Sequence, residues 1–459
     1  MMSVDHAVSK RAALFVTTLA AFLSPLAVSS VNVALPSIGK EFLMDAILLS
    51  WVSTAYLLAS AMFLVPFGKI ADIYGRKRIF TYGIITFTLA SIGCAISNSA
   101  MMLVCFRTLQ GFGTAAIYCI GAAILTSSFP SKELGKVLGI NVAAVYLGYS
   151  LGPFLGGFLT ENLGWRSLFL VNVLLGSVII VFILWKLKGE WREEEKKKID
   201  LAGSVIYTVT LFLIMYGFSH LSAMLGVWLI LPGFLGILAF VKWETRVEGP
   251  VLDINLFRNN RVFALSNLAT LINYSATFAV TFLLSLYLQY IKRLTPGNAG
   301  LILIAQPIVQ AFCSPFAGRL SDRIEPRIVA SVGMALTGIG LSLLAILSEK
   351  TGLIFIVASL VLLGFGFAFF SVPTMNGVMS SVENRFYGVA SGMLGTMRAM
   401  GMVFSMGITI LIFSIYIGDA QIVPGYYPVF LRCMKLALTF FAFLCFGGIF
   451  ASLARGKVR

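Results

Sequence analysis

The chain has 459 residues, of which 59% are apolar and 12% are charged, and its formal net charge is +15. Soluble globular proteins carry about a quarter of charged residues, so this composition excludes that class and indicates an integral membrane protein. The positive charge would suit nucleic acid, but it is sorted by side of the membrane, and nucleic acid is therefore not an expected partner.

Apolar stretches recur along the whole chain, and each is long enough to cross a bilayer as a helix of about twenty residues. They predict an all-α integral membrane protein with about fourteen spans. In chain order, the predicted spans cover residues 12–35, 47–67, 79–96, 100–127, 137–160, 167–185, 201–218, 222–241, 262–290, 298–316, 328–347, 352–372, 387–416 and 430–453.

Lys and Arg residues gather on one side of these spans. That side includes Lys10, the run Arg76–Arg78, the cluster from Lys186 to Lys198 and the basic C-terminal tail. The positive-inside rule makes it cytoplasmic, and an even number of spans places both termini there. We therefore expect a multi-pass protein of the cell membrane, with lipids and a small-molecule substrate as partners and a monomer as the functional unit.

The spans divide into two sets of six that are separated by two charged loops and two further spans. The predicted organisation is an N-terminal six-helix bundle, a cytoplasmic charged linker, an inserted helix pair, a second linker and a C-terminal six-helix bundle, at residues 1–187, 188–200, 201–241, 242–261 and 262–459. Duplicated bundles with polar loops in matching places are typical of secondary transporters.

A short motif of glycine, aspartate and basic residues follows the second span and is repeated in the second half. The two copies contain Gly68, Asp72, Gly75, Arg76 and Lys77, and Gly318, Asp322 and Arg323. A carboxylate beside cations at a helix end can act as a conformational latch that holds helix ends together in one state. We expect Gly68 and Gly75 to supply tight turns. The alternative is a solvated loop that only fixes the topology.

The fifth span carries glycines at every fourth position, beside a proline. The residues are Gly148, Gly152, Pro153, Gly156 and Gly157. Glycines at this spacing form a smooth face that another helix can approach closely, and the proline removes a backbone donor and bends the helix. Such a helix suits gating of one side of the bundle, and the alternative is ordinary helix packing.

Arg107 and Arg398 fall inside predicted spans, where a guanidinium costs several kcal/mol unless it faces the bundle interior. Each arginine either organises neighbouring helices or faces a cavity, where it helps to bind a polar or anionic substrate group or steers protons. The other candidates for substrate or coupling groups are polar residues at similar depth, namely Gln110, Asn32, Asn273, Tyr274 and Gln289.

Taken in order, these motifs resemble the major facilitator superfamily, and within it the fourteen-span drug:proton antiporter family. The signatures G-x-x-A-D-x-x-G-R-[RK]-[RK], G-x-x-x-G-P-x-x-G-G and N-V-A-L-P are matched at 68–78, 148–157 and 32–36. Residues 107–115 are similar to R-x-x-Q-G-x-G-A-A, with Thr114 in place of the first alanine. The resemblance covers nearly the whole chain. It implies a secondary active transporter that exports hydrophobic or amphipathic small molecules by alternating access, of the multidrug-efflux type, with protons as the coupling ion. The alternatives are a transporter of another solute, such as a metabolite anion, and a non-transporting membrane sensor.

The chain departs from the family pattern in its first span. The family places an Asp five residues before the position of Asn32, and this chain has Ala27 there. A buried carboxylate would pair with a cationic drug and carry the exchanged proton. We therefore predict neutral or anionic substrates over cationic ones, and we expect Ala27→Asp to add cation binding.

No cofactor, metal or enzymatic activity is expected. His6 and His220 are the only histidines, and the six cysteines fall in or beside spans, where they suit packing rather than a metal site or a disulfide set. The sequence has no G-x-x-x-x-G-K-[ST] phosphate loop, so it does not predict an ATP-driven motor.

Overall fold

The computed structural model describes residues 2–187, 200–221, 224–247, 258, 260–382, 387–418 and 420–456. In these ranges, fourteen helical segments are long and apolar enough to cross a membrane. The helices are α1 (Met2–Phe42), α2 (Ala46–Tyr74), α3 (Arg76–Ala95), α4 (Ala100–Ser128), α5 (Ser131–Leu163), α6 (Arg166–Lys186), α7 (Leu201–Ser219), α8 (Met224–Glu244), α10 (Arg261–Leu286), α11 (Pro296–Leu303), α12 (Ala305–Arg323), α13 (Pro326–Ala345), α14 (Leu353–Ser380), α15 (Tyr387–Tyr416) and α16 (Tyr427–Ala454). Most of the two predicted linkers lies outside the described residues.

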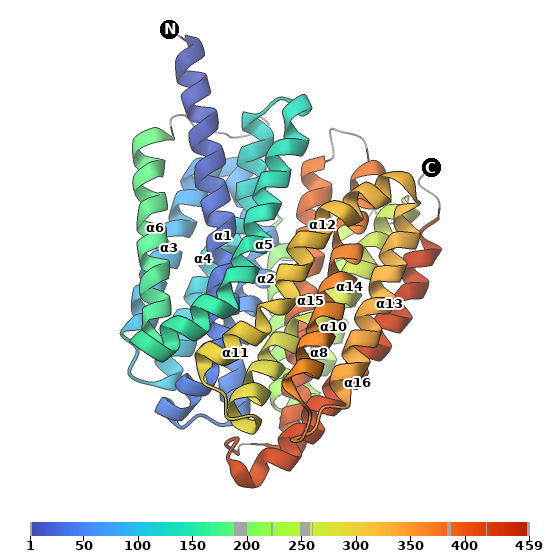
Figure 1. Ribbon diagram of the computed structural model, residues 1–459. Coiled ribbons are helices and arrows are strands. Elements are labelled where there is room, and N and C mark those ends of the chain that lie inside the picture. The colour runs from blue at the N-terminus through green and yellow to red at the C-terminus, as the bar shows by residue number, and fades with distance from the viewer. Residues whose placement is uncertain are drawn as a thin grey trace.

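Helices α1–α6 form one bundle and α10–α16 form the other, and the two lie side by side (Figure 1). The chain therefore has the predicted all-α fold of two six-helix bundles with an inserted pair. Both ends of the chain lie at the same end of the molecule, which is the upper end in Figure 1. We call this end the terminal face and the other end the opposite face.

Two helices differ from the sequence prediction. α2 continues to Tyr74, so Gly68 lies within the helix, and the turn predicted there is wrong. Gly75 does end the helix, with a φ of 107° that suits glycine. The predicted span 298–316 is broken into α11 and α12 around Ile304. Pro307 explains the break, because it has no N–H to donate to the carbonyl of Leu303.

The glycines of α5 bring it close to a neighbouring helix, as predicted. A Cβ atom added at Gly148 would lie 2.5 Å from the carbonyl oxygen of Phe22, and one at Gly156 would lie 2.5 Å from that of Ser30. One at Gly152 would overlap the side chain of Ser29 on the same helix, α1. The three glycines therefore form the face on which α1 packs.

The inserted helix α7 packs against both bundles, because it contacts α2 of the first and α15 of the second. The Thr208 hydroxyl donates to the carbonyl oxygen of Met62 at 3.2 Å. Four residues further along α2 stands Pro66, which cannot donate the helical hydrogen bond that this carbonyl would otherwise accept. Thr208 of α7 thus supplies the hydrogen bond that the backbone of α2 lacks at this point. α7 also packs beside the contact between α2 and α15.

Candidate functional site

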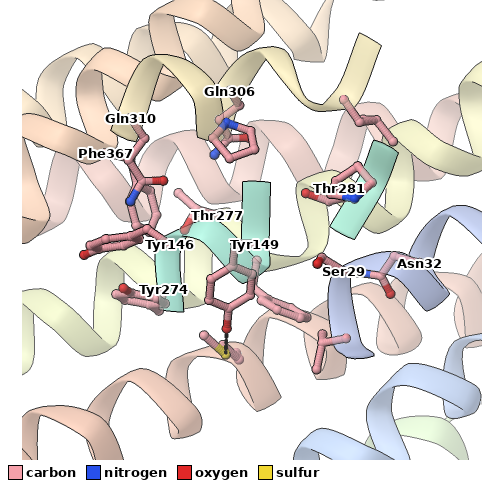
Figure 2. A pocket seen from close by; sticks show the side chains of 16 residues that line it. Ser29, Asn32, Tyr146, Tyr149, Tyr274, Thr277, Thr281, Gln306, Gln310 and Phe367 are labelled. Carbon is pink, nitrogen blue, oxygen red and sulfur yellow. Dashed lines mark hydrogen bonds between the residues drawn. The ribbon is translucent and has the colours of Figure 1, made fainter. Parts of the chain in front are cut away.

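A cavity of about 680 Å³, counting the open space at its mouth, lies between the two bundles. Its walls come from α1 and α5 of the first bundle and from α10, α11, α12, α14 and α15 of the second. The hydroxyl and amide groups that line it belong to Ser29, Asn32, Thr277, Thr281, Gln306 and Gln310, and the rings to Tyr146, Tyr149, Tyr274, Phe278 and Phe367. Figure 2 shows these groups converging from opposite sides. We call this space the aromatic chamber.

A second space of about 470 Å³, again counting open space, adjoins the first, and we call it the arginine chamber because Arg398 lines it. The two chambers share Val28, Tyr149 and Met402. The Tyr149 hydroxyl lies 3.8 Å from the sulfur of Met402, a contact that crosses from α5 to α15 (Figure 2). A thin wall built from both bundles therefore separates the two chambers.

Three of the seven predicted substrate or coupling residues line these chambers. Asn32 and Tyr274 line the aromatic chamber, and Arg398 lines the arginine chamber. The side-chain carbonyl oxygen of Asn32 accepts a hydrogen bond from the Ser53 hydroxyl at 2.7 Å, and this bond holds the Asn32 side chain against α2. The Tyr274 ring meets the Phe367 ring edge-to-face, with 5.2 Å between centroids. Both side chains are thus held in place before any solute enters.

Arg107 lines neither chamber. It is fully buried, and it donates to the carbonyl oxygen of Val52 at 3.0 Å and to the Gln110 side chain at 2.6 Å. Gln110 in turn donates to Ser91 at 2.7 Å. These bonds tie α4 to α2 and α3, so the geometry matches the organising role rather than the cavity-facing one.

Asn273 and Gln289 also stand apart from the lining. Asn273 is fully buried within α10. Gln289, in the π-helical turn Tyr287–Ile291 that follows α10, donates to the carbonyl oxygen of Val33 at 2.8 Å. It therefore joins the second bundle to the first instead of facing the cavity.

The lining also includes four residues that were not predicted from the sequence, Tyr146, Tyr149, Thr277 and Thr281. A signal was present, because Tyr274, Thr277 and Thr281 recur at spacings of three and four in an apolar span and so share one helix face. Tyr146, Tyr149 and Pro153 repeat the same spacing in α5. Polar and aromatic residues at helical spacing within a span would have identified both walls.

Hydrogen bonds and close backbone contacts between α5 and α11 join the two bundles at the opposite face. The hydrogen bonds run from Gln289 to Val33 at 2.8 Å, from Gly297 N–H to Glu161 at 2.8 Å, from Ala46 N–H to Ala420 at 3.1 Å and from Gln421 to Leu43 at 2.7 Å. Gly157 of α5 packs directly on the backbone of Pro296 and Gly297 in α11. The opposite face is therefore closed between the bundles.

The predicted latch residues lie at the terminal face. Asp72 pairs with Arg76 at 2.8 Å, and Arg76 also donates to Ser127 of α4, so these bonds lie within the first bundle. Lys77 follows in the first turn of α3. In the second copy Asp322 and Arg323 are exposed at the end of α12, and Asn376 of α14 donates to Ser321 at 2.7 Å. Gly318 lies within α12.

The charge of the lining is one-sided. Among the described residues that line the two chambers there is no Asp or Glu, and Arg398 carries the positive charge.

Ala27 is fully buried in the apolar core and lines neither chamber. An acid at position 27 would therefore enter the core, and this position gives no support to the expectation that it would bind cations in the cavity, which stays a prediction. No group of three metal-ligating side chains occurs in the part of the chain that the structure describes.

Comparison with known proteins gives consistent results. The sequence profile of the Major Facilitator Superfamily matches residues 17–247 and 267–456. The riboflavin transporter RibZ of Clostridioides difficile (strain 630) is 29% identical over 394 residues, which cover 86% of each chain. The multidrug resistance protein Stp of Mycobacterium tuberculosis (strain CDC 1551 / Oshkosh) is 31% identical over 398 residues, 84% of this chain and 73% of Stp. A crystal structure of a bacterial homologue of the human lysosomal transporter Spinster, inward-facing and unoccupied, superposes with a TM-score of 0.68 at 15% identity over 97% of each chain.

Proposed function

Because this chain belongs to the Major Facilitator Superfamily, we propose that it is a secondary active transporter that exports amphipathic small molecules across the cell membrane. The observation that carries the proposal is the cavity between two bundles that are joined at the opposite face. Two bundles that rock about a central site expose it to each side of a membrane in turn. This arrangement suits alternating access.

The lining of the aromatic chamber supports a substrate with apolar rings and polar edges. Aromatic walls bury a flat apolar body, and a few hydroxyl and amide groups fix its orientation. Relatives named as a riboflavin transporter and as a multidrug resistance protein agree with such a solute. Since no carboxylate belongs to the described lining, we propose neutral or anionic solutes rather than cationic drugs.

The distribution of basic residues supports a cytoplasmic terminal face. In that orientation the structure is closed toward the outside, and Gly157 against α11 forms part of the outer seal. The two motif copies around Asp72 and Asp322 would then latch the cytoplasmic ends of the helices in the other state. In a proton-coupled cycle the carrier would be a helix-end acid such as Asp72 or Glu41, because the chambers offer none.

Transport by the purified protein in proteoliposomes tests this function. Vesicles are loaded with neutral, anionic and cationic dyes and examined with and without an imposed pH gradient, against protein-free vesicles. We expect protein-dependent movement of neutral or anionic dyes, and faster movement under the gradient if protons are coupled. Dye movement equal to that of protein-free vesicles for every dye would refute the proposal.

A further inference from the structure

The positively charged side chain of Arg398 faces a cavity, and the described residues satisfy only part of its hydrogen-bonding capacity. It lies in α15 and lines the arginine chamber together with Tyr118, Tyr149 and Thr114. Its Nε atom is buried and has no hydrogen-bond partner among the described residues. The Tyr274 ring lies 5.7 Å from the guanidinium carbon, at the outer limit of a cation–π contact. A guanidinium at this depth is costly unless something compensates its charge.

Two other buried arginines show how this protein compensates such a charge when it is structural. Arg107 makes two hydrogen bonds, to a backbone carbonyl and to Gln110, and lies 4.3 Å from the Tyr56 ring, while its Nη2 atom is buried without a partner among the described residues. Arg455, at the end of α16, donates to the carbonyl oxygen of Ser452 at 2.9 Å and to the Ser266 hydroxyl at 3.3 Å. Arg398 lacks an equivalent set and faces a space large enough for a ligand group.

The two chambers also complement each other chemically. The aromatic chamber offers tyrosine and phenylalanine rings with amide and hydroxyl groups, and the arginine chamber offers a positive charge. The residues that border both chambers are Val28, Tyr149 and Met402, and the Tyr149 hydroxyl lies 3.8 Å from the Met402 sulfur. A solute long enough to pass these residues would place rings in one chamber and an anionic group in the other.

From these observations we propose that Arg398 is the substrate-binding residue for an oxyanion, and that the substrate is a planar aromatic molecule with a carboxylate or phosphate group. This inference rests on the proposed transport function and narrows its substrate class. A charge-assisted hydrogen bond from guanidinium to oxyanion is stronger than a neutral one, and arginine presents several donors in one plane. Arg398 thus selects charge, while the aromatic chamber selects shape.

Binding of matched dyes to the purified protein tests the proposal without requiring transport. Fluorescein and rhodamine 123 share a xanthene ring but differ in charge, and riboflavin and riboflavin 5′-phosphate share a flavin ring and differ by the phosphate. We expect the anionic member of each pair to bind more tightly. Arg398→Gln should weaken binding of the anions by about tenfold to a hundredfold and leave riboflavin unchanged. The first pair reports on carboxylate and the second on phosphate.

A control and a second substitution protect the test from a folding defect. Arg432→Gln removes the same charge from an exposed position on α16 and should leave all four affinities unchanged. Gly395 lines the arginine chamber three residues before Arg398, and a Cβ atom added there meets nothing within 4 Å. Gly395→Asp should pair with Arg398, weaken anion binding by about tenfold or more and strengthen rhodamine 123 binding. Gly395→Asn, nearly equal in size but uncharged, measures the effect of the added volume alone, and we expect anion binding to be weaker and rhodamine 123 binding to be stronger in Gly395→Asp than in Gly395→Asn.

The outcomes separate this inference from the transport function. Unchanged fluorescein and riboflavin 5′-phosphate affinities in both Arg398→Gln and Gly395→Asp would overturn the anion site, even if proteoliposomes move neutral dyes. Tighter binding of rhodamine 123 than of fluorescein to the unmodified protein would overturn it as well. Arginine-dependent anion binding in a protein that moves no dye would support the site and refute the proposed function instead.

Discussion

The contact between Gly157 and α11 should determine how strongly the opposite face stays closed. A Cβ atom added at Gly157 would overlap the carbonyl oxygen of Pro296 and lie 3.0 Å from the Cα of Gly297. Gly157→Ala therefore forces two backbones apart in the conformation described here. Overpacking of this kind costs about 1–3 kcal/mol, which corresponds to a shift of about 5-fold to 150-fold in a conformational equilibrium.

A neighbouring glycine provides a matched control. Gly156→Ala introduces the same methyl group against the backbone of Ser30, but α5 and α1 belong to one bundle. Because that contact is kept when the bundles move relative to each other, Gly156→Ala should lower thermal stability without shifting the conformational equilibrium. The two variants differ in one position of sequence and in which bundle the new methyl group meets.

Distances between the bundles measure the effect. Asn98 and Lys350 are exposed at the opposite face and belong to different bundles. The distance between spin labels at these two positions, measured by pulsed electron–electron double resonance, reports the opening of the opposite face. The six native cysteines are replaced first. We expect a longer-distance population to grow in Gly157→Ala and not in Gly156→Ala. Identical distance distributions in the unmodified protein and Gly157→Ala, or an equal shift in both variants, would show that the contact between Gly157 and α11 does not hold the opposite face closed.

Further predictions concern topology, the latch, the core and the inserted helix. A reporter active only outside the cytoplasm and fused to the C-terminus should stay silent, because the basic residues predict cytoplasmic termini; a strong signal would contradict the topology. Asp72→Asn should insert normally but slow dye transport in proteoliposomes, since it removes the charge that pairs with Arg76 at 2.8 Å; an unchanged rate would leave Asp72 without a latch role. Ala27→Asp should lower the thermal stability, because it buries a carboxylate in the core; a stable variant that gains rhodamine 123 binding would contradict this. Thr208→Val should destabilise the protein by about 1 kcal/mol by leaving the Met62 carbonyl without its donor, and an unchanged melting temperature would argue against that bond.

The class of fold follows from local features of the sequence. A bilayer requires about twenty apolar residues per crossing, and that requirement is local, so the fourteen spans could be read directly from the chain. The spacing of Gly148, Gly152 and Gly156 likewise predicted a close helix contact, because residues four apart always share a helix face. Features set by neighbours in sequence were therefore predictable.

The roles of the individual polar residues depended on the tertiary structure. Arg107 and Arg398 look alike in sequence, since each is an arginine within an apolar span. Packing turns Arg107 toward carbonyl and amide partners on α2 and α4, whereas Arg398 faces a chamber between the bundles. Gln289 reaches α1 across the bundle interface, and Ala27 faces the core. The direction in which a side chain points depends on how its helix is rotated against helices far away in sequence, and local residue spacing does not determine that rotation.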